Sequence, residues 1–166
     1  MPAPSELEEK LRELSLFPPT TLPVLSIYLN TQPDQHGRDH FEPFLRKELK
    51  ARGATYPLRS PERASFERDA ERTMSWLGTE LRPSSNGAAI FACAGSDDFF
   101  EAFQFDSPFQ SNQLYVYHPP HLSTLAHLLD QYRPYEAEIT DKHSARILFF
   151  GLGRTIHAAS VTNVKV

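Results

Sequence analysis

Three histidines lie close together in the sequence, and histidine is a common metal ligand. His118 and His121 frame the segment His118-Pro119-Pro120-His121, and His127 follows six residues later. A tetrahedral metal site needs further Cys, His or acidic ligands. Neither a cysteine nor a pair of acids lies near these histidines, so we favour a structural turn over a metal site.

Patterns that support catalysis are weak elsewhere in the chain. The Gly-x-Ser-x-Gly motif of an α/β-hydrolase nucleophile is absent. Gly151-Leu152-Gly153 is too short for a dinucleotide-binding loop and lies between predicted strands. Asp141 follows a predicted strand, where a ribonuclease-H-type nuclease would carry a metal-binding acid, but it lacks partner acids. We predict no catalytic set, no metal site and no cofactor in these residues.

A cluster of cationic side chains around a predicted helix–helix loop is the remaining candidate site. Its members are Arg46, Lys47, Lys50, Arg52, Arg59 and Arg63. Lysine and arginine contact the phosphates of nucleic acids and gain affinity by counterion release. Tyr56 in the same loop could stack on a base. Glu48, Glu62 and Glu67 are interspersed with the cations, so from the residues alone we favour an ordinary solvated helical face, and a phosphate-binding surface is the alternative.

Two predicted helices position this loop. Asp39, with Glu42 three residues later, is typical of a helix start, and Ser60-Pro61-Glu62 is a second start signal. Apolar residues recur at helical spacing after each start: Phe41, Phe44, Leu45 and Leu49 in the first helix, and Phe66, Ala70, Thr73, Met74, Leu77 and Leu81 in the second. Two further helices are expected, one with a Leu7, Leu11 and Leu14 stripe and one over 122–132.

Short apolar runs predict the strands of a sheet. The runs are Val24–Leu29, Ala88–Cys93, Phe99–Phe105 and Leu114–Tyr117. We therefore predict an α+β fold, with a mixed or antiparallel four-stranded sheet packed by helices. Phenylalanines dominate one face of the third run, which makes this face a candidate protein-interaction or dimer surface. Glu101 interrupts it, as expected near a sheet edge.

A joint at Pro134 divides the chain into two predicted units, 1–133 and 134–166. After it, the runs Ala137–Thr140, Ala145–Gly151 and Thr155–Val166 predict a β-meander. A meander of this length buries little apolar surface and is marginally stable alone. We interpret it as the first strands of a second, truncated domain.

Composition limits the class of protein. With 166 residues, 40% apolar content and a single cysteine, Cys93, the sequence predicts a globular core without an internal disulfide. The net charge is −4, and residues 38–82 carry 10 basic and 8 acidic side chains, so no segment is basic enough to indicate nucleic acid by charge alone. We expect a cytoplasmic protein, with no membrane segment and no DNA partner.

The order of these elements resembles the N-terminal domain of class 1 peptide chain release factors. It looks most similar to the bacterial archaeo-eukaryotic release-factor-like family. The resemblance covers about residues 22–160, and its most specific pieces are Asn86–Phe91, the Phe105–Phe109 connection and Asp141–Ile147. It implies an α+β recognition domain followed by a central ribonuclease-H-like domain.

Two functional motifs of that family differ in this sequence. Where release factors have Asn-Ile-Lys-Ser between the two helices, this chain has Arg52–Arg59. Their Tyr-x-Cys-x-x-x-Phe motif corresponds to Tyr115–His121, where Tyr115 is retained, and the resemblance adds Tyr115 to the predicted RNA-binding set. The Gly-Gly-Gln motif of their hydrolytic tip does not occur in these residues. The resemblance, with these differences, therefore implies ribosome rescue or another ribosome-linked process rather than stop-codon reading.

Three functional hypotheses remain open from the sequence. The first is a non-catalytic domain that docks on the ribosome or on tRNA. The second is part of a peptidyl-tRNA hydrolase whose catalytic residues lie downstream. The third is a protein-interaction domain, or a homo-oligomer, that uses the Phe-rich sheet face.

Overall fold

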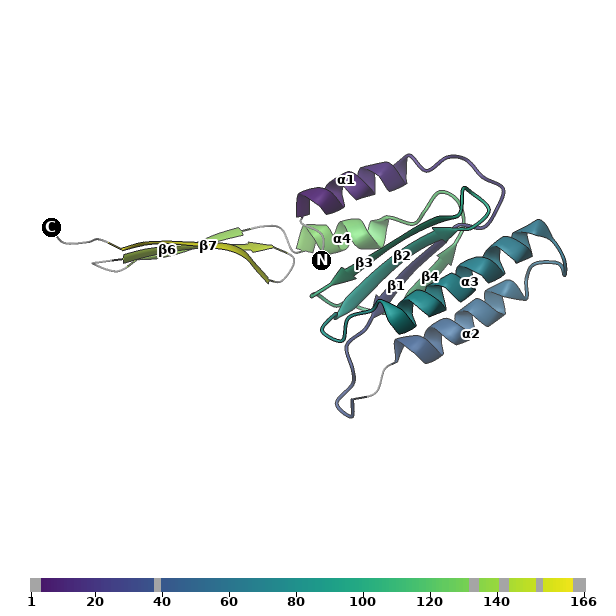
Figure 1. Cartoon of the computed structure of the whole chain (residues 1–166), viewed down its shortest axis with the longest axis horizontal. Coiled ribbons are helices and arrows are strands. Elements are labelled where there is room, and N and C mark those ends of the chain that lie inside the picture. Colours follow the sequence, from purple (N-terminus) through teal and green to yellow (C-terminus); the bar gives the residue numbers. More distant parts are fainter. Residues whose placement is uncertain (1–3, 38–39, 132–134, 141–143, 152–153, 163–166) are drawn as a thin grey trace.

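The computed structural model describes residues 4–37, 40–131, 135–140, 144–151 and 154–162. Within these ranges the chain forms a four-stranded sheet with helices on both faces, followed by a three-stranded sheet (Figure 1). The predicted α+β class is confirmed. No helix in the described ranges is long and apolar enough to cross a membrane.

The four-stranded sheet is built from β1 (Leu25–Asn30), β2 (Gly87–Cys93), β3 (Phe99–Phe105) and β4 (Gln113–Val116). The strand order is β3-β2-β1-β4, and every neighbouring pair is antiparallel. The sequence left a mixed or an antiparallel sheet open, and the sheet is antiparallel throughout. β2 is buried along its whole length, whereas β3 and β4 form the two edges.

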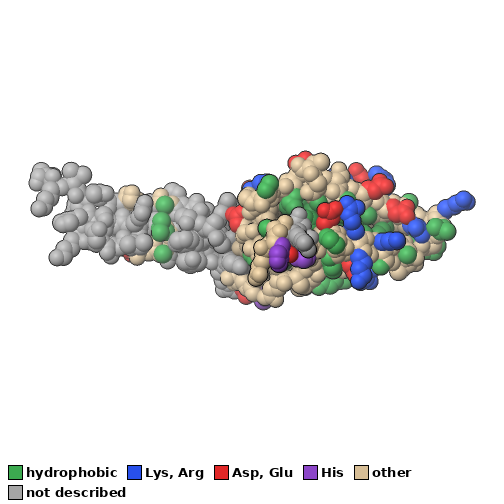
Figure 2. All heavy atoms as spheres, turned by 90° about the horizontal axis from the view of Figure 1, so that it is seen from below, with side chains coloured by type: hydrophobic (Ala, Val, Ile, Leu, Met, Phe, Trp, Pro, Cys, Tyr) green, Lys and Arg blue, Asp and Glu red, His purple; other side chains and the backbone are tan. Residues whose placement is uncertain are grey.

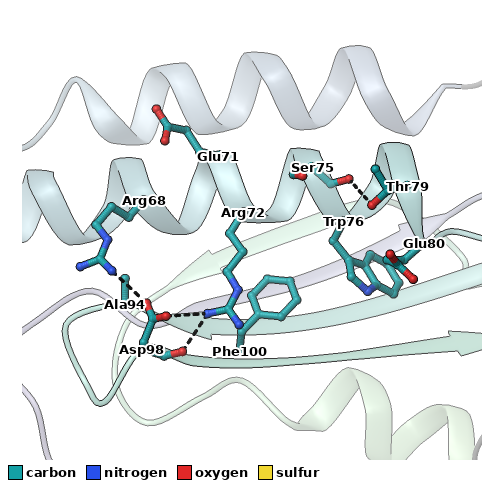
Figure 3. A pocket seen from close by; sticks show the side chains of 10 residues that line it. All are labelled: Arg68, Glu71, Arg72, Ser75, Trp76, Thr79, Glu80, Ala94, Asp98 and Phe100. Atoms are coloured by element: carbon teal, nitrogen blue, oxygen red, sulfur yellow. Dashed lines mark hydrogen bonds and ion pairs between the residues drawn. The ribbon is translucent and has the colours of Figure 1, made fainter.

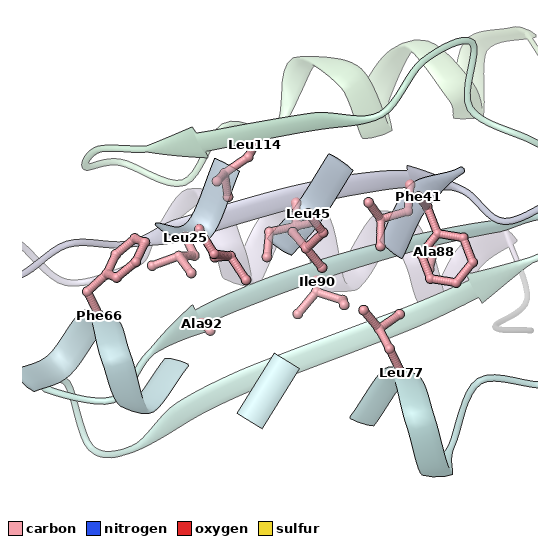
Figure 4. Close-up of a cluster of buried hydrophobic side chains, with 12 residues drawn as sticks. Leu25, Phe41, Leu45, Phe66, Leu77, Ala88, Ile90, Ala92 and Leu114 are labelled. Carbon is pink, nitrogen blue, oxygen red and sulfur yellow. The ribbon is translucent and has the colours of Figure 1, made fainter. Parts of the chain in front are cut away.

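Helices α2 (Phe41–Gly53) and α3 (Pro61–Thr79) cover one face of this sheet (Figure 1). Alternate residues of the strands point toward these helices because side chains alternate between the faces of a sheet. The side chains between the sheet and these helices form a buried hydrophobic cluster that includes Leu25, Ile27, Leu45, Phe66, Ile90 and Leu114 (Figure 4). The helical stripes predicted for α2 and α3 are confirmed at Phe41, Leu45, Leu49, Phe66, Thr73 and Leu77.

Helices α1 (Pro4–Ser15) and α4 (Ser123–Gln131) cover the opposite face. Their buried leucines pack with the aromatic side chains of the strands, in a cluster that includes Leu7, Leu14, Tyr28, Phe91, Phe103, Phe105, Leu125 and Leu128. Phe103 and Phe105 are buried by these contacts. Phe103 and Phe105 are therefore covered within the chain itself, which counts against the predicted use of the Phe-rich face as a partner or dimer surface, and a homo-oligomer stays a prediction.

Start signals explain where α3 begins. The Ser60 side chain accepts a hydrogen bond from the Arg63 N–H at 3.1 Å, and Pro61 occupies the first helical position, as the sequence predicted. Asp39, the predicted cap of α2, lies outside the described residues. The N-cap of α2 is His40, whose side chain makes no capping hydrogen bond.

A second sheet follows the first in the chain. Strands β5 (Tyr135–Thr140), β6 (Ser144–Gly151) and β7 (Arg154–Thr162) pair antiparallel in chain order, which confirms the predicted meander. In Figure 1 this sheet extends from the end of the molecule opposite the α2–α3 loop. Pro134 and Asp141 lie outside the described residues, and the division into two domains stays a prediction.

Candidate nucleic-acid interface

The loop between α2 and α3 is held in shape by hydrogen bonds among its own residues. The Thr55 N–H and hydroxyl both donate to the Arg52 carbonyl, at 3.0 and 2.7 Å, and the Ser60 N–H donates to the Pro57 carbonyl at 3.2 Å. Arg59 has a positive φ of 65°, in the left-handed region that side chains other than glycine rarely adopt. The loop therefore has a defined turn geometry immediately before α3 begins.

An aromatic contact anchors the loop to the core. The Tyr56 ring packs against Phe66, with 5.7 Å between ring centroids, and Phe66 is fully buried. Burial raises the pKa of Tyr56, which Arg52 opposes and Glu62 reinforces. Arg63 reaches back to the Tyr56 carbonyl at 3.4 Å. Tyr56 is thus half-buried and supports the loop, and its predicted role in base stacking is untested.

Ion pairs divide the predicted cations into two groups. Three arginines pair with a glutamate one turn away: Arg46 with Glu42 at 2.6 Å, Arg52 with Glu48 at 3.9 Å and Arg63 with Glu67 at 2.7 Å. For Lys47, Lys50 and Arg59, the described part of the chain offers no carboxylate within ion-pairing distance. These three exposed cations are the strongest phosphate-binding candidates.

Over the end of the molecule that α2 and α3 form, cationic and acidic side chains alternate (Figure 2). Residues 41–67 carry six cations, all of them in the predicted set, and four glutamates, so this segment has a net charge of +2. The whole chain has a net charge of −4. The α2–α3 end is therefore a local positive region on an acidic protein.

Leu58 is a feature of this end that sequence analysis did not single out. It lies at the tip of the loop beside Arg59, and 79% of its surface is exposed. A single exposed apolar side chain is ordinary on a protein surface, so Leu58 is of interest only through its place at the loop tip among the cations. The signal in the sequence is an apolar residue between Pro57 and Arg59, outside either helical stripe.

Tyr115, the remaining predicted RNA-binding residue, lies across the sheet from the cations. Its neighbours Leu114 and Val116 pack in the cluster under α2 and α3, whereas Tyr115 packs in the cluster under α1 and α4. Val116 pairs with Leu25, and Figure 4 shows Leu25 at the same end of the sheet as Phe66. The structure thus brings Tyr115 to the end of the sheet that the loop occupies, but on the other face.

His121 organises the surroundings of Tyr115. The two rings stack with 3.7 Å between centroids, and the His121 ring also bonds to the Tyr117 hydroxyl and, at 2.8 Å, to the Ser123 hydroxyl. Partial burial lowers the pKa of His121, which favours the neutral imidazole. Both ring nitrogens therefore have hydrogen-bond partners, as expected for a histidine that shapes a turn.

This cluster lines one side of a groove of about 540 Å³ between β4 and α4. The groove also contains Gln113, whose side-chain oxygen accepts hydrogen bonds from the Tyr115 and Thr124 hydroxyls at 3.2 and 3.0 Å. His121 and His127 line this groove, and the described residues contain no group of three or more His, Cys, Asp or Glu side chains placed to hold a metal ion. The groove combines stacked rings with hydroxyl and amide groups.

Comparison with known proteins gives a similarity of fold. No protein-family model matches this sequence, and no curated protein matches it. Among solved structures, it is similar to the crystal structure of the archaeal translation termination factor aRF1, with a TM-score of 0.60 and 18% identity over 95% of this chain. It is also similar to the structure of another archaeal protein, with a TM-score of 0.55 and 19% identity over 94% of this chain.

The class of protein follows from this comparison. The chain has a release-factor-like α+β fold, and at this level of identity the likeness concerns the fold alone. It spans 44% of the length of each of the two solved chains. Membership of the bacterial release-factor-like family stays a prediction.

Proposed function

We propose that this chain is a translation-related docking domain that contacts ribosomal RNA or tRNA through the end formed by α2, α3 and their loop. Lys47, Lys50 and Arg59 make the phosphate contacts, and Leu58 makes an apolar contact at the loop tip. The observation that carries the proposal is a set of exposed cations without acidic partners among the described residues, on a release-factor-like fold.

The other predicted residues have supporting roles in this proposal. Arg46, Arg52 and Arg63 hold α2 and α3 in shape through their glutamate pairs and add to the positive field. Tyr56 fixes the loop against Phe66. Tyr115 lies on the far face, so an RNA that reaches it must extend around the end of the sheet, past the turn at 117–121.

The test is co-sedimentation of the protein with ribosomes over a series of salt concentrations. Two variants probe the interface: Lys50→Glu, and Arg59→Asp, in which an aspartate suits the positive φ at that position. Arg12→Glu on α1 is the matched control, because Arg12 is exposed, lies on the other side of the sheet and changes the net charge by the same amount.

We expect binding to weaken as salt rises, because each phosphate contact releases condensed counterions. Each interface variant should weaken binding by a similar factor for any RNA sequence. Each should also reduce the magnitude of the slope of log affinity against log salt concentration by about 1, the value of one phosphate contact. Arg12→Glu should bind as the wild type does. Equal losses for all three variants would show a general charge effect, and binding that does not depend on salt would contradict the proposal.

Hydrolysis of peptidyl-tRNA by a longer protein stays a prediction that the described residues do not test. A single-turnover assay of the longer protein, with peptidyl-tRNA on stalled large ribosomal subunits, distinguishes the two functions. A docking domain leaves the ester intact.

A further inference from the structure

The outer edge of β3 presents backbone groups that no described strand uses. The Thr31 N–H bonds to the Asn86 carbonyl at 3.0 Å, so the even-numbered residues of β2 bond to β1, and the odd-numbered ones bond to β3. The β2–β3 register pairs odd with odd, Ala89 with Phe103 for example. The N–H and C=O groups of Phe100, Ala102 and Gln104 therefore point away from the sheet.

This edge is long and weakly protected. β3 has seven residues, whereas the other edge strand, β4, has four. Proteins usually block such edges with proline, bulges or charged residues. The three residues with outward backbone groups are uncharged, and Glu101, the one charged residue of β3, is drawn toward Lys10 of α1 at 3.4 Å. An extended peptide can therefore add to β3 as a fifth strand.

A hollow lies beside β3 on each face of the sheet. On the α3 side, a hollow of about 570 Å³ is lined by Trp76, Phe100 and Arg72, whose guanidinium lies 4.5 Å from the centre of the Phe100 ring (Figure 3). On the α1 side, a hollow of about 290 Å³ is lined by Phe17 and Phe99, among others. Side chains of an added strand would alternate between the two faces and so reach both hollows.

Charge indicates what kind of peptide fits. The two hollows together hold six acids and three cations: Glu13, Glu71, Glu80, Asp97, Asp98 and Glu101 against Lys10, Arg68 and Arg72. The cations are already paired, because Arg68 and Arg72 contact Asp98 at 3.1 and 3.3 Å and Lys10 contacts Glu13 at 2.8 Å. No described cation pairs with Glu71, Glu80 or Asp97, so a lysine- or arginine-bearing strand is complementary.

We propose that the β3 edge binds an extended, basic segment of a partner protein by strand addition. A second copy of this chain is disfavoured, because edge-to-edge pairing would bring two such acidic sets together. RNA is disfavoured for the same reason. This surface lies apart from the α2–α3 end, so the proposal does not depend on RNA docking.

The probe is a fluorescent heptapeptide of alternating lysine and valine, measured by anisotropy at low salt. Two N-methylated forms give the sharpest test: one carries a methyl group on the backbone nitrogen of every lysine, the other on the backbone nitrogen of every valine. They have the same charge and side chains, but in an added strand only one set of N–H groups faces β3. We expect one form to bind as the parent does and the other at least about tenfold more weakly.

Protein variants locate the site. Ala102→Pro removes an outward N–H and leaves the β2–β3 hydrogen bonds intact, so it should weaken peptide binding at least about tenfold. Glu71→Gln with Glu80→Gln should weaken it without touching the backbone, and circular dichroism should show that all variants are folded. Amide signals of Phe100, Ala102 and Gln104 should shift when the peptide binds.

Three results would overturn the proposal. The first is no binding of the peptide at low salt, and the second is equal affinity for both N-methylated forms, which would show attraction by charge without strand pairing. The third is a dimer, seen by sedimentation, that Ala102→Pro dissociates. In that case the occupant of the edge is a second copy of this chain.

Discussion

A buried carboxyl group on α3 should make the stability of this domain depend on pH. Asp69 is 1% exposed, and its Oδ1 accepts a hydrogen bond from the Ala94 N–H at 2.8 Å. Its Oδ2 has no hydrogen-bond partner among the described residues. Burial raises the pKa of Asp69 from 3.8 to about 7; the Ala94 N–H opposes this rise, as do Arg68 and Arg72, and Asp98 adds to it.

The direction of the effect follows from the two pKa values. Between 3.8 and about 7, the unfolded chain has released the proton and the folded protein has kept it, so rising pH favours the unfolded state. The free energy of unfolding should fall through this window and level off above it. Each unit of pKa corresponds to about 1.4 kcal/mol, so the full difference is about 4 kcal/mol.

Asp69→Asn removes this titration and keeps the side-chain oxygen that binds Ala94. We would measure the free energy of unfolding of both proteins by urea denaturation from about pH 4 to about pH 8. The difference between variant and wild type should shift in favour of the variant by about 4 kcal/mol as pH rises. Subtraction cancels the contributions of distant groups common to both proteins.

Thr73→Val is the control. Thr73 is buried one turn from Asp69, and its hydroxyl has no hydrogen-bond partner among the described residues. Neither threonine nor valine ionises, so this substitution does not change the titration. The difference in free energy of unfolding between Thr73→Val and the wild type should be the same at every pH. A constant difference for Asp69→Asn as well would refute the reasoning, since it would show that the folded protein tolerates the ionised carboxylate.

Four further substitutions test how the core and the site are held together, each by urea denaturation. Phe66→Ala should cost about 3–5 kcal/mol, because it empties the buried position under the loop. Ser60→Ala should cost about 1 kcal/mol through the lost α3 cap. Gly87→Ala should cost about 1–3 kcal/mol, because a Cβ there would lie 2.6 Å from the Ser107 carbonyl oxygen. Gly78→Ala should stabilise the protein by about 0.5–1 kcal/mol, because Gly78 lies in α3 with open space around its Cα. A decrease in stability would contradict the placement of Gly78 in an exposed turn of the helix.

Local patterns were sufficient to predict the elements of this fold. The run Phe99–Phe105 has the same bounds as β3, and Ser60-Pro61 marks the start of α3, because strand alternation and helix capping are properties of short segments. Strand order was not predicted. Nothing local states that β1 pairs with both β2 and β4, since these pairings join residues far apart in the chain.

The candidate site shows the same limit. The cations around the α2–α3 loop could be found from the sequence, but which of them remain unpaired depends on side-chain geometry: Arg46 contacts Glu42, whereas Lys50 contacts no described carboxylate. Asp69 was missed for a different reason. It falls on the same helical stripe as Phe66 and Thr73, where the period alone predicts burial, but an acid at such a position is ordinarily assumed to face solvent.

Helix α3 connects the features that the proposals use. Its N-cap Ser60 and its residue Phe66 hold the loop. On the same half of the helix, the Ser65 hydroxyl accepts a hydrogen bond from the Gly95 N–H at 3.0 Å and Asp69 accepts one from the Ala94 N–H at 2.8 Å, which fastens the β2–β3 turn. Ionisation of Asp69 would therefore strain a junction that lies between a basic end and an acidic edge. Since the two surfaces carry opposite charge and share no side chain, salt should weaken both, but Lys50→Glu should affect only RNA binding and Ala102→Pro only peptide binding. Loss of both activities in either variant would mean that α3 couples them.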